Sequence, residues 1–195
     1  MTPNLHERLD AILPKVTSRD FLEGKGLGNE ISFWIFDYLP QDELIVRKHI
    51  EFLMVQIPKQ HPNLRVAHVN LFDLMIDYLR DRKHLDRAIE MQKAKGNEAL
   101  LKALAAPLHG SKIAEFLARK VPVQELDLLF LSGVGSAFPL LRSHNLLNNL
   151  HSVMGSTPLV LFYPGIYDGQ SLSLFGQIKA EAHRNNYYRA FKLVP

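Results

Sequence analysis

Four short apolar runs, each separated from the next by a helical pattern, constrain the fold of this chain more than any other feature. The runs cover residues 31–36, 66–69, 126–131 and 159–163. Parallel strands need long crossover connections, and a sheet covered on both faces has strands that are apolar throughout. The sequence therefore predicts an α/β fold, a three-layer sandwich with a mainly parallel sheet. Residues 187–193 alternate in the manner of a final, more exposed strand.

The helices that connect these strands are indicated by apolar residues at helical spacing. A short N-terminal helix is expected to close at Pro14, and a helix beginning near Asp42 is expected to end at Pro58. Asn70 is a predicted N-cap for the next helix. The residues expected on the buried faces of these helices and of a later one are Val46, Ile50, Leu53, Ile57, Leu74, Met75, Tyr78, Leu79, Leu147, Leu150 and Met154.

Residues 80–124 are rich in charge and read as a helical insertion of two or three helices within a single domain that spans 1–195. A break is expected at 95–97, where Gly96 lies, and Ser111 is a predicted helix cap. After the third strand, 132–136 form a glycine- and serine-containing turn, and Pro139 is expected in the first turn of the following helix. Pro164 is expected to end the fourth strand.

Composition excludes several kinds of chemistry. The chain has no cysteine, so disulfides, thiolate nucleophiles and cysteine-ligated metal sites are ruled out. Residues 1–8 lack the pattern of a signal peptide, and no stretch reaches about 18 apolar residues, so we expect a cytoplasmic protein with no membrane span. The net charge of +3 matches the basic excess after residue 175. This basic end leaves a DNA contact open, although an ordinary solvated surface explains it more simply.

The carboxyl ends of parallel strands are where ligands collect, so the polar residues just after each run define a candidate rim. Asp37 and Tyr38 follow the first run, Asn70 the second, 132–136 the third and 163–170 the fourth. The helix after the third strand adds Arg142 and an amide-rich face, for which a solvated helix surface is the competing interpretation. The rim residues of this strand end and helix are His144, Asn145, Asn149, Tyr163, Tyr167 and Asp168.

No complete catalytic motif accompanies this rim. The phosphate-binding pattern G-x-x-x-x-G-K-[ST] is missing, and the glycines at 24–28 precede their strand rather than follow it. The third strand ends in Ser132, where a nucleotide hydrolase carries a magnesium-binding Asp. Ser132 and Ser136 also lack the G-x-S-x-G pattern of serine hydrolases, and the histidines lack metal-ligand spacing. The sequence therefore predicts no catalytic residue, no cofactor and no metal site, on a P-loop-like or Rossmann-like core without a phosphate motif.

Four blocks of the sequence resemble a known family. They are FLEGKGLGNEISFWIFDYLPQDEL at 21–44, LFLSGVGSAFPLLRSHNLLNNL at 129–150, PLVLFYPGIYDGQSLSLFG at 158–176 and NYYRAFKL at 186–193. This chain resembles the BrxB family of BREX bacteriophage-exclusion systems over nearly its whole length. The resemblance implies a non-catalytic component of an anti-phage system that assembles other proteins. It implies the alkaline-phosphatase-like component PglZ as the leading partner, the BREX methyltransferase and ATPase as further partners, and no catalytic residues to carry over.

Three hypotheses of function follow. In the first, the chain is a protein-binding scaffold that docks through its rim or through its C-terminal strand, because aromatic residues and arginine dominate interface energetics. The anchors on that strand would be Tyr187, Tyr188, Arg189 and Phe191. In the second, Asp37, Arg142, His144 and Asp168 form a nucleotide or phosphate site of a regulatory protein. In the third, the chain is an accessory DNA-binding protein. All three hypotheses are compatible with a homodimer.

Overall fold

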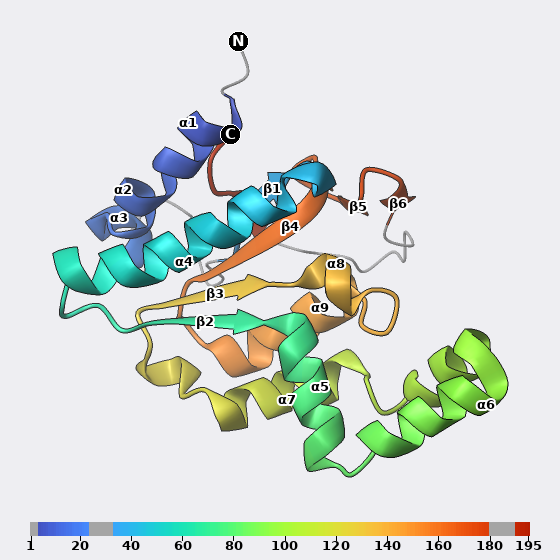
Figure 1. The fold of residues 1–195 in the computed structure, drawn as a ribbon. Helices are drawn as coiled ribbons and strands as arrows, with labels where there is room; N and C mark the ends of the chain where they lie inside the picture. Colours follow the sequence, from blue (N-terminus) through green and yellow to red (C-terminus); the bar gives the residue numbers. More distant parts are fainter. Residues whose placement is uncertain (1–3, 24–32, 180–189) are drawn as a thin grey trace.

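The computed structural model describes residues 4–23, 33–179 and 190–195, and it shows a central sheet between two helical layers (Figure 1). Five parallel strands of the described chain make the sheet in the spatial order β2-β3-β4-β1-β7. The strands are β1 (Phe33–Tyr38), β2 (Val66–Asn70), β3 (Leu128–Ser132), β4 (Leu159–Tyr167) and β7 (Ala190–Lys192). The prediction of a three-layer α/β fold with a mainly parallel sheet is confirmed.

Side chains of the central strands alternate between two separate cores, as the period of a strand requires. Phe33 and Ile35 of β1 face one layer, whereas Trp34 and Phe36 face the other. One layer contains α1 (Leu5–Asp10), α2 (Ile12–Val16), α3 (Arg19–Leu22) and α4 (Glu43–Gln60). The opposite layer contains α5 (Leu71–Asp81), α7 (Gly110–Lys120), α8 (Val134–Ala137) and α9 (Ser143–Met154). Because both faces are covered, the strands are apolar throughout.

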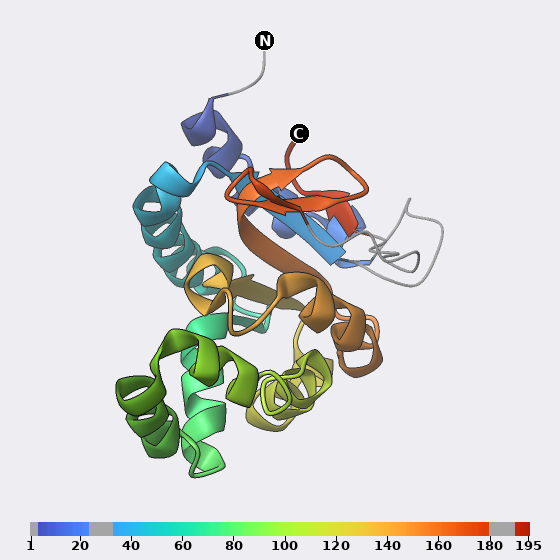
Figure 2. The ribbon, with the colours of Figure 1, turned by 90° about the vertical axis from the view of Figure 1, so that its right-hand side faces the viewer.

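Helix α6 (Leu85–Leu104) extends away from the sheet at the green end of the molecule (Figures 1 and 2). It bends at Gly96, whose φ of 79° is a left-handed conformation that favours glycine, so the predicted break at 95–97 is confirmed. A 3-10 turn, η2 (Val123–Glu125), leads from α7 into β3. Another, η1 (Pro40–Asp42), leads from β1 into α4.

The predicted caps and buried faces of the helices are largely correct. The Asn70 side chain caps α5 by accepting from the amides of Phe72 and Asp73 at 2.9 and 3.4 Å. The predicted apolar residues of α4, α5 and α9 are buried. Ser111 is not the cap of α7, because His109 holds that position and its ring accepts from the Ser111 amide at 3.4 Å.

Proline was a poor guide to where elements end. Pro14 lies inside α2 and Pro58 lies inside the last turn of α4, so both predicted ends were wrong. Pro139 follows α8 through a cis peptide bond and precedes α9, rather than opening one continuous helix. Pro164 does not end β4, which continues to Tyr167 and turns back as an antiparallel hairpin with β5 (Leu172–Leu174). A two-residue strand, β6 (Ile178–Lys179), then pairs with β5.

Candidate functional site

The carboxyl ends of the parallel strands lie at one edge of the sheet, as the sequence predicts. Asp37 is level with Tyr163, Tyr38 with Pro164, and Asn70 with Ser132. The β4–β5 hairpin continues from this edge. The chemistry available here therefore depends on what these side chains contact.

Asp37 is a buried carboxylate held by three different parts of the chain. Its oxygens lie 2.8 Å from Nη2 of Arg8 and 3.2 Å from Nζ of Lys192, and the Tyr167 amide donates to it at 3.1 Å. Only 6% of the residue is exposed. Arg8 comes from α1 and also stacks its guanidinium over Phe36, 4.8 Å from the ring centre. Asp37 thus joins both chain ends to the middle of the sheet, with its charge already compensated.

The tyrosines of the predicted rim are buried, and Tyr38 and Tyr167 donate hydrogen bonds within the protein. The Tyr38 hydroxyl donates to the Glu43 carboxylate at 2.6 Å, and burial together with this bond raises the pKa of Tyr38. Tyr167 donates to the carbonyls of Ala190 and Gly169 at 2.7 and 3.0 Å, and burial raises its pKa as well. Tyr163 is 1% exposed. None of the three presents its hydroxyl group as an exposed acid or base.

Asp168 is exposed and shapes a turn. Its carboxylate accepts from the amides of Gln170 and Ser171 at 2.8 and 2.6 Å, and the Ser171 hydroxyl donates to it at 2.6 Å. These bonds, the hydroxyl bond first, hold its pKa at about 2. A carboxylate tied in this way forms an Asx-type turn, which explains why an Asp-Gly pair stands here.

The amide-rich face of α9 lies against α7, apart from Asp37. Asn149 donates to the Asn145 carbonyl at 2.6 Å, one turn back along the helix. Gly110 of α7 packs so closely on α9 that a Cβ atom there would lie 2.3 Å from the Asn145 carbonyl oxygen. Arg142 is exposed at the N-terminus of α9. The side chain of His144 lies outside the described part of the structure, as do residues Tyr187, Tyr188 and Arg189.

Phe191, the remaining predicted anchor, lies on the edge strand β7 and packs against the core on the α1–α4 side of the sheet. Its ring lies 5.6 Å from that of Trp34, and 37% of the residue is exposed. The structure therefore distributes the predicted rim residues over three places: the Asp37 cluster with its hairpin, the α9 face, and the edge strand.

The glycine turn after β3 is filled by the protein's own side chains. A Cβ atom on Gly133 would lie 2.1 Å from the Asn70 side-chain oxygen, and one on Gly135 would lie 3.1 Å from the Phe175 ring and 3.2 Å from Pro164. The helix that follows has four residues. Asn70 and the β4–β5 hairpin thus occupy the space in which a phosphate would have to approach the backbone.

The turn after β1, where a P-loop protein carries its phosphate loop, is equally unsuited to an anion. It contains Leu39 and the 3-10 turn η1 instead of glycines, and α4 begins at the carboxylate of Glu43. Glu43 binds Tyr38 at 2.6 Å and Arg47 at 2.7 Å. The negative charge of Glu43 offsets the positive end of the helix dipole, which would otherwise attract a phosphate.

The sequence analysis missed one polar pair at the sheet edge. Nε2 of His68 on β2 lies 2.8 Å from the Ser132 hydroxyl on β3. Burial lowers the pKa of His68, opposed by the charges of Asp73 and Glu51. Ser132 is 4% exposed. Since the two residues stand diagonally across neighbouring strands, the strand register reveals this contact and the sequence spacing does not.

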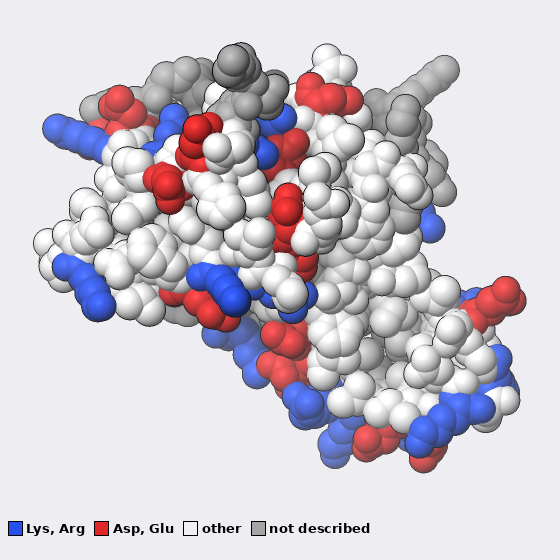
Figure 3. Space-filling view, turned by 45° about the horizontal axis from the view of Figure 1, so that its top comes forward, with Lys and Arg blue, Asp and Glu red and all other residues white. Residues whose placement is uncertain are grey.

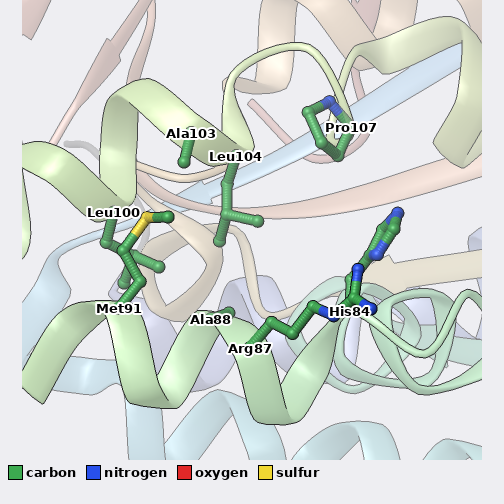
Figure 4. Close-up of a pocket in the computed structure, with 8 residues that line it drawn as sticks. All are labelled: His84, Arg87, Ala88, Met91, Leu100, Ala103, Leu104 and Pro107. Atoms are coloured by element: carbon green, nitrogen blue, oxygen red, sulfur yellow. The ribbon is translucent and has the colours of Figure 1, made fainter.

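Three cavities lined by described residues are in the helical periphery. One of about 200 Å³ lies between the two limbs of the bent α6, where Met91 and Leu100 face each other (Figure 4). Another, of about 750 Å³, lies between the ends of α5 and α7, and a third, of about 430 Å³, lies beside η2. No group of three metal-binding side chains occurs within 4–23, 33–179 and 190–195. Across the same residues, no helix combines the length and apolar character needed to cross a bilayer.

Comparison with known proteins gives the family. The model of a family described as "BREX protein BrxB" matches residues 67–193. The chain belongs to the BrxB family. Over 194 residues it is 43% identical to a BREX protein BrxB of Bacillus cereus (strain H3081.97), with 97% of each chain covered. Over 193 residues it is 44% identical to a BREX protein BrxB of Escherichia coli O9:H4 (strain HS), covering 99% of this chain and 93% of the relative. No solved structure matches.

Membership of this family makes the chain a component of a BREX system, which implies a role in phage defence. The resemblance noted in the sequence is thereby confirmed.

Proposed function

We propose that this BrxB-family protein is a non-catalytic scaffold that binds another BREX protein through the outer face of α4. PglZ is the leading partner, on the family resemblance described above. The methyltransferase and the ATPase of the same system are further partners. The observation that carries the proposal is that α4 is apolar on both of its faces.

The inner face of α4 packs on the sheet, and its outer face holds a second apolar stripe. Val46, Ile50, Leu53 and Ile57 are at most 2% exposed. The outer stripe consists of Leu44, Ile45, Phe52 and Val55, which are 69, 40, 47 and 50% exposed. A surface helix normally has charged and polar residues opposite its buried face, so an apolar outer stripe indicates a surface that another protein covers.

The composition of this face also fits a protein interface. Phe52 supplies an exposed aromatic ring, which packs beside the His49 ring at 5.5 Å. Lys48 and Lys59 lie three to four residues from members of the stripe, so they stand among its apolar side chains on the same face. Interfaces of this kind depend on one or two aromatic anchors within a polar surround.

The sheet edge supports the non-catalytic part of the proposal. Its polar groups are engaged in holding the protein together: Asp37 with Arg8 and Lys192, and Asn70 with the cap of α5. The C-terminal strand, with Phe191 exposed on it, stays a second candidate docking surface.

Affinity purification of the tagged protein from its native host, with nuclease treatment, tests the proposal. The wild type should recover PglZ, and a Phe52→Ala/Val55→Ala variant should lose it while its circular dichroism is unchanged. Phe72→Ala removes an aromatic ring of 37% exposure from α5 and is the matched control. Retention of PglZ by the double variant would show that α4 is not the docking surface.

Recovery without any BREX protein would overturn the scaffold role itself. If the tagged protein instead recovers an untagged copy of itself, light scattering would show a dimer and α4 would be its interface. The nucleotide-regulator alternative requires ATP, GTP or a cyclic dinucleotide to bind with micromolar affinity in isothermal titration, and to lose that affinity in Arg142→Ala.

A further inference from the structure

The net positive charge of this protein comes from one segment. Residues 80–124 contain ten lysines and arginines against five aspartates and glutamates, a net charge of +5, whereas the rest of the chain contains 13 against 15. The lower margin of the molecule, where α5 and α6 lie, accordingly shows many blue side chains with fewer red ones among them (Figure 3). The charge excess at the C-terminal end is therefore not the largest one.

Part of this charge surrounds the cavity of about 750 Å³ between the ends of α5 and α7. Its permanent cations are Arg82, Lys112 and Arg119, and one carboxylate, Glu115, lies among them. We call this the cationic groove; its lining residues are Tyr78, Arg82, His84, Ala106, Pro107, Lys112, Glu115 and Arg119.

Two of the groove cations, Arg82 and Arg119, stack on aromatic rings, as does the neighbouring Lys120. The guanidinium of Arg82 lies 5.7 Å from the centre of the Tyr78 ring. The Arg119 guanidinium and the Lys120 ammonium lie 5.3 and 5.4 Å from the centre of the Phe116 ring. The two rings meet edge to face at 5.3 Å. Such stacking positions a cation and leaves its hydrogen-bond donors available to a ligand.

Acidic neighbours compensate these cations only weakly. Arg82 has Asp81 at 3.9 Å, with both side chains about half exposed, and such pairs contribute little in water. Within the described residues, Lys112, Arg119 and Lys120 have no carboxylate oxygen within 4.0 Å. Lys112 instead donates to the Ala106 carbonyl at 3.0 Å.

We propose that the cationic groove binds the phosphate backbone of double-stranded DNA. Exposed, hydrated cations on two neighbouring helices suit a polyanion that is bound through its phosphates, without recognition of its base sequence. The aromatic rings beneath them are buried, with Tyr78 5% and Phe116 2% exposed, so they offer no face for stacking unpaired bases. This favours a duplex over a single strand. The site is distinct from the α4 docking face.

Fluorescence anisotropy with a labelled 30-base-pair duplex of arbitrary sequence tests the proposal on the full-length protein between 50 and 200 mM salt. Lys112→Ala/Arg119→Ala should raise the Kd several-fold and lower the salt slope by about two, at about 0.9 per lost phosphate contact. Glu115→Gln should lower the Kd. The charge-keeping variant Lys112→Arg/Arg119→Lys should bind as the wild type does.

The matched control is Lys48→Ala/Lys59→Ala, which removes the same charge from α4 and should leave DNA binding within twofold. An equal loss of DNA affinity in both double variants would show that binding depends only on net charge, and would overturn the proposed DNA site. Absence of binding at 50 mM salt, tighter binding of a single strand of equal length, or equal competition by polyglutamate at the same charge concentration would each overturn it as well. Recovery of PglZ should be unaffected by the groove variant, so failure of this proposal and failure of the scaffold are distinguishable.

Discussion

The carboxyl edge of the sheet and the helical periphery use polar and apolar residues in opposite ways. At the edge, Asp37, Tyr38, Tyr167 and Asn70 each have hydrogen-bond or ionic partners inside the protein. On the periphery, the α4 stripe is exposed and the cations around the groove have weak acidic partners or none among the described residues. A polar side chain beyond a strand end is thus no sign of a ligand site until its partners are known. Exposed groups without internal partners are better indicators.

The largest loss of stability that tests this contrast is expected at Asp37. Asp37→Ala leaves the Arg8 guanidinium in a part-buried site without its carboxylate, and breaking such a pair costs about 3–5 kcal/mol. The free energy of unfolding, measured by urea denaturation, should fall by that amount. A stable Asp37→Ala variant that has lost a partner or a ligand would instead mean that the cluster serves binding.

The two faces of α4 give the next largest difference. Ile50→Ala creates a cavity in a 2% exposed position and should reduce the free energy of unfolding by about 2–5 kcal/mol. Phe52→Ala removes a larger side chain from the outer face and should change it by no more than about 0.5 kcal/mol. Comparable losses in the two variants would show that the outer stripe stabilises the isolated protein, and the case for a partner on α4 would fail.

A smaller effect is expected at the glycine turn. Gly133→Ala places a Cβ atom on the Asn70 side chain in a left-handed conformation and should cost about 1–3 kcal/mol, measured by thermal unfolding. The control is the same substitution in an Asn70→Ala background, which removes the side chain that the new Cβ atom would meet, so Gly133→Ala should cost less there. An equal cost in both backgrounds would mean that Asn70 has room to move, and that the turn is less filled than its geometry indicates.

The smallest effect concerns pH. The His151 ring stacks on Phe33 at 4.3 Å, its nitrogens are buried without partners among the described residues, and burial lowers its pKa. The unfolded chain then binds a proton more readily than the folded one. Stability should therefore be flat above pH 6.5 and fall as the pH decreases below it.

Urea denaturation at pH 7.5, 6.5 and 5.5 measures this fall, and His151→Phe should reduce it. The rest of the fall belongs to His49 and His68, whose pKa values burial also lowers. An unchanged pH dependence in His151→Phe would show that the ring gains water in solution.

Local patterns predicted the elements and their order but not where proline-containing elements end. Apolar runs located strands β1 to β4, and helical spacing located the buried faces of α4, α5 and α9. Pro58 was misread because a proline removes only one amide donor from a helix, and the chain continues the helix for two residues beyond it. Pro164 was misread because it lies where β4 leaves the parallel sheet for a hairpin. The outer stripe of α4 was present in the sequence, in the apolar residues out of phase with its buried face.

The sequence by itself determined the fold class, the family and the absence of a phosphate-binding motif, because each depends on residue types and on spacings along the chain. The tertiary structure alone decided which polar residues are used up in internal contacts. Arg8, Asp37 and Lys192 are distant in the chain and meet only because β1 lies between β4 and β7, with α1 packed at their end. The cationic groove likewise forms only where α7 packs beside α5, since charges far apart in sequence act together only when folding reduces the distance between them.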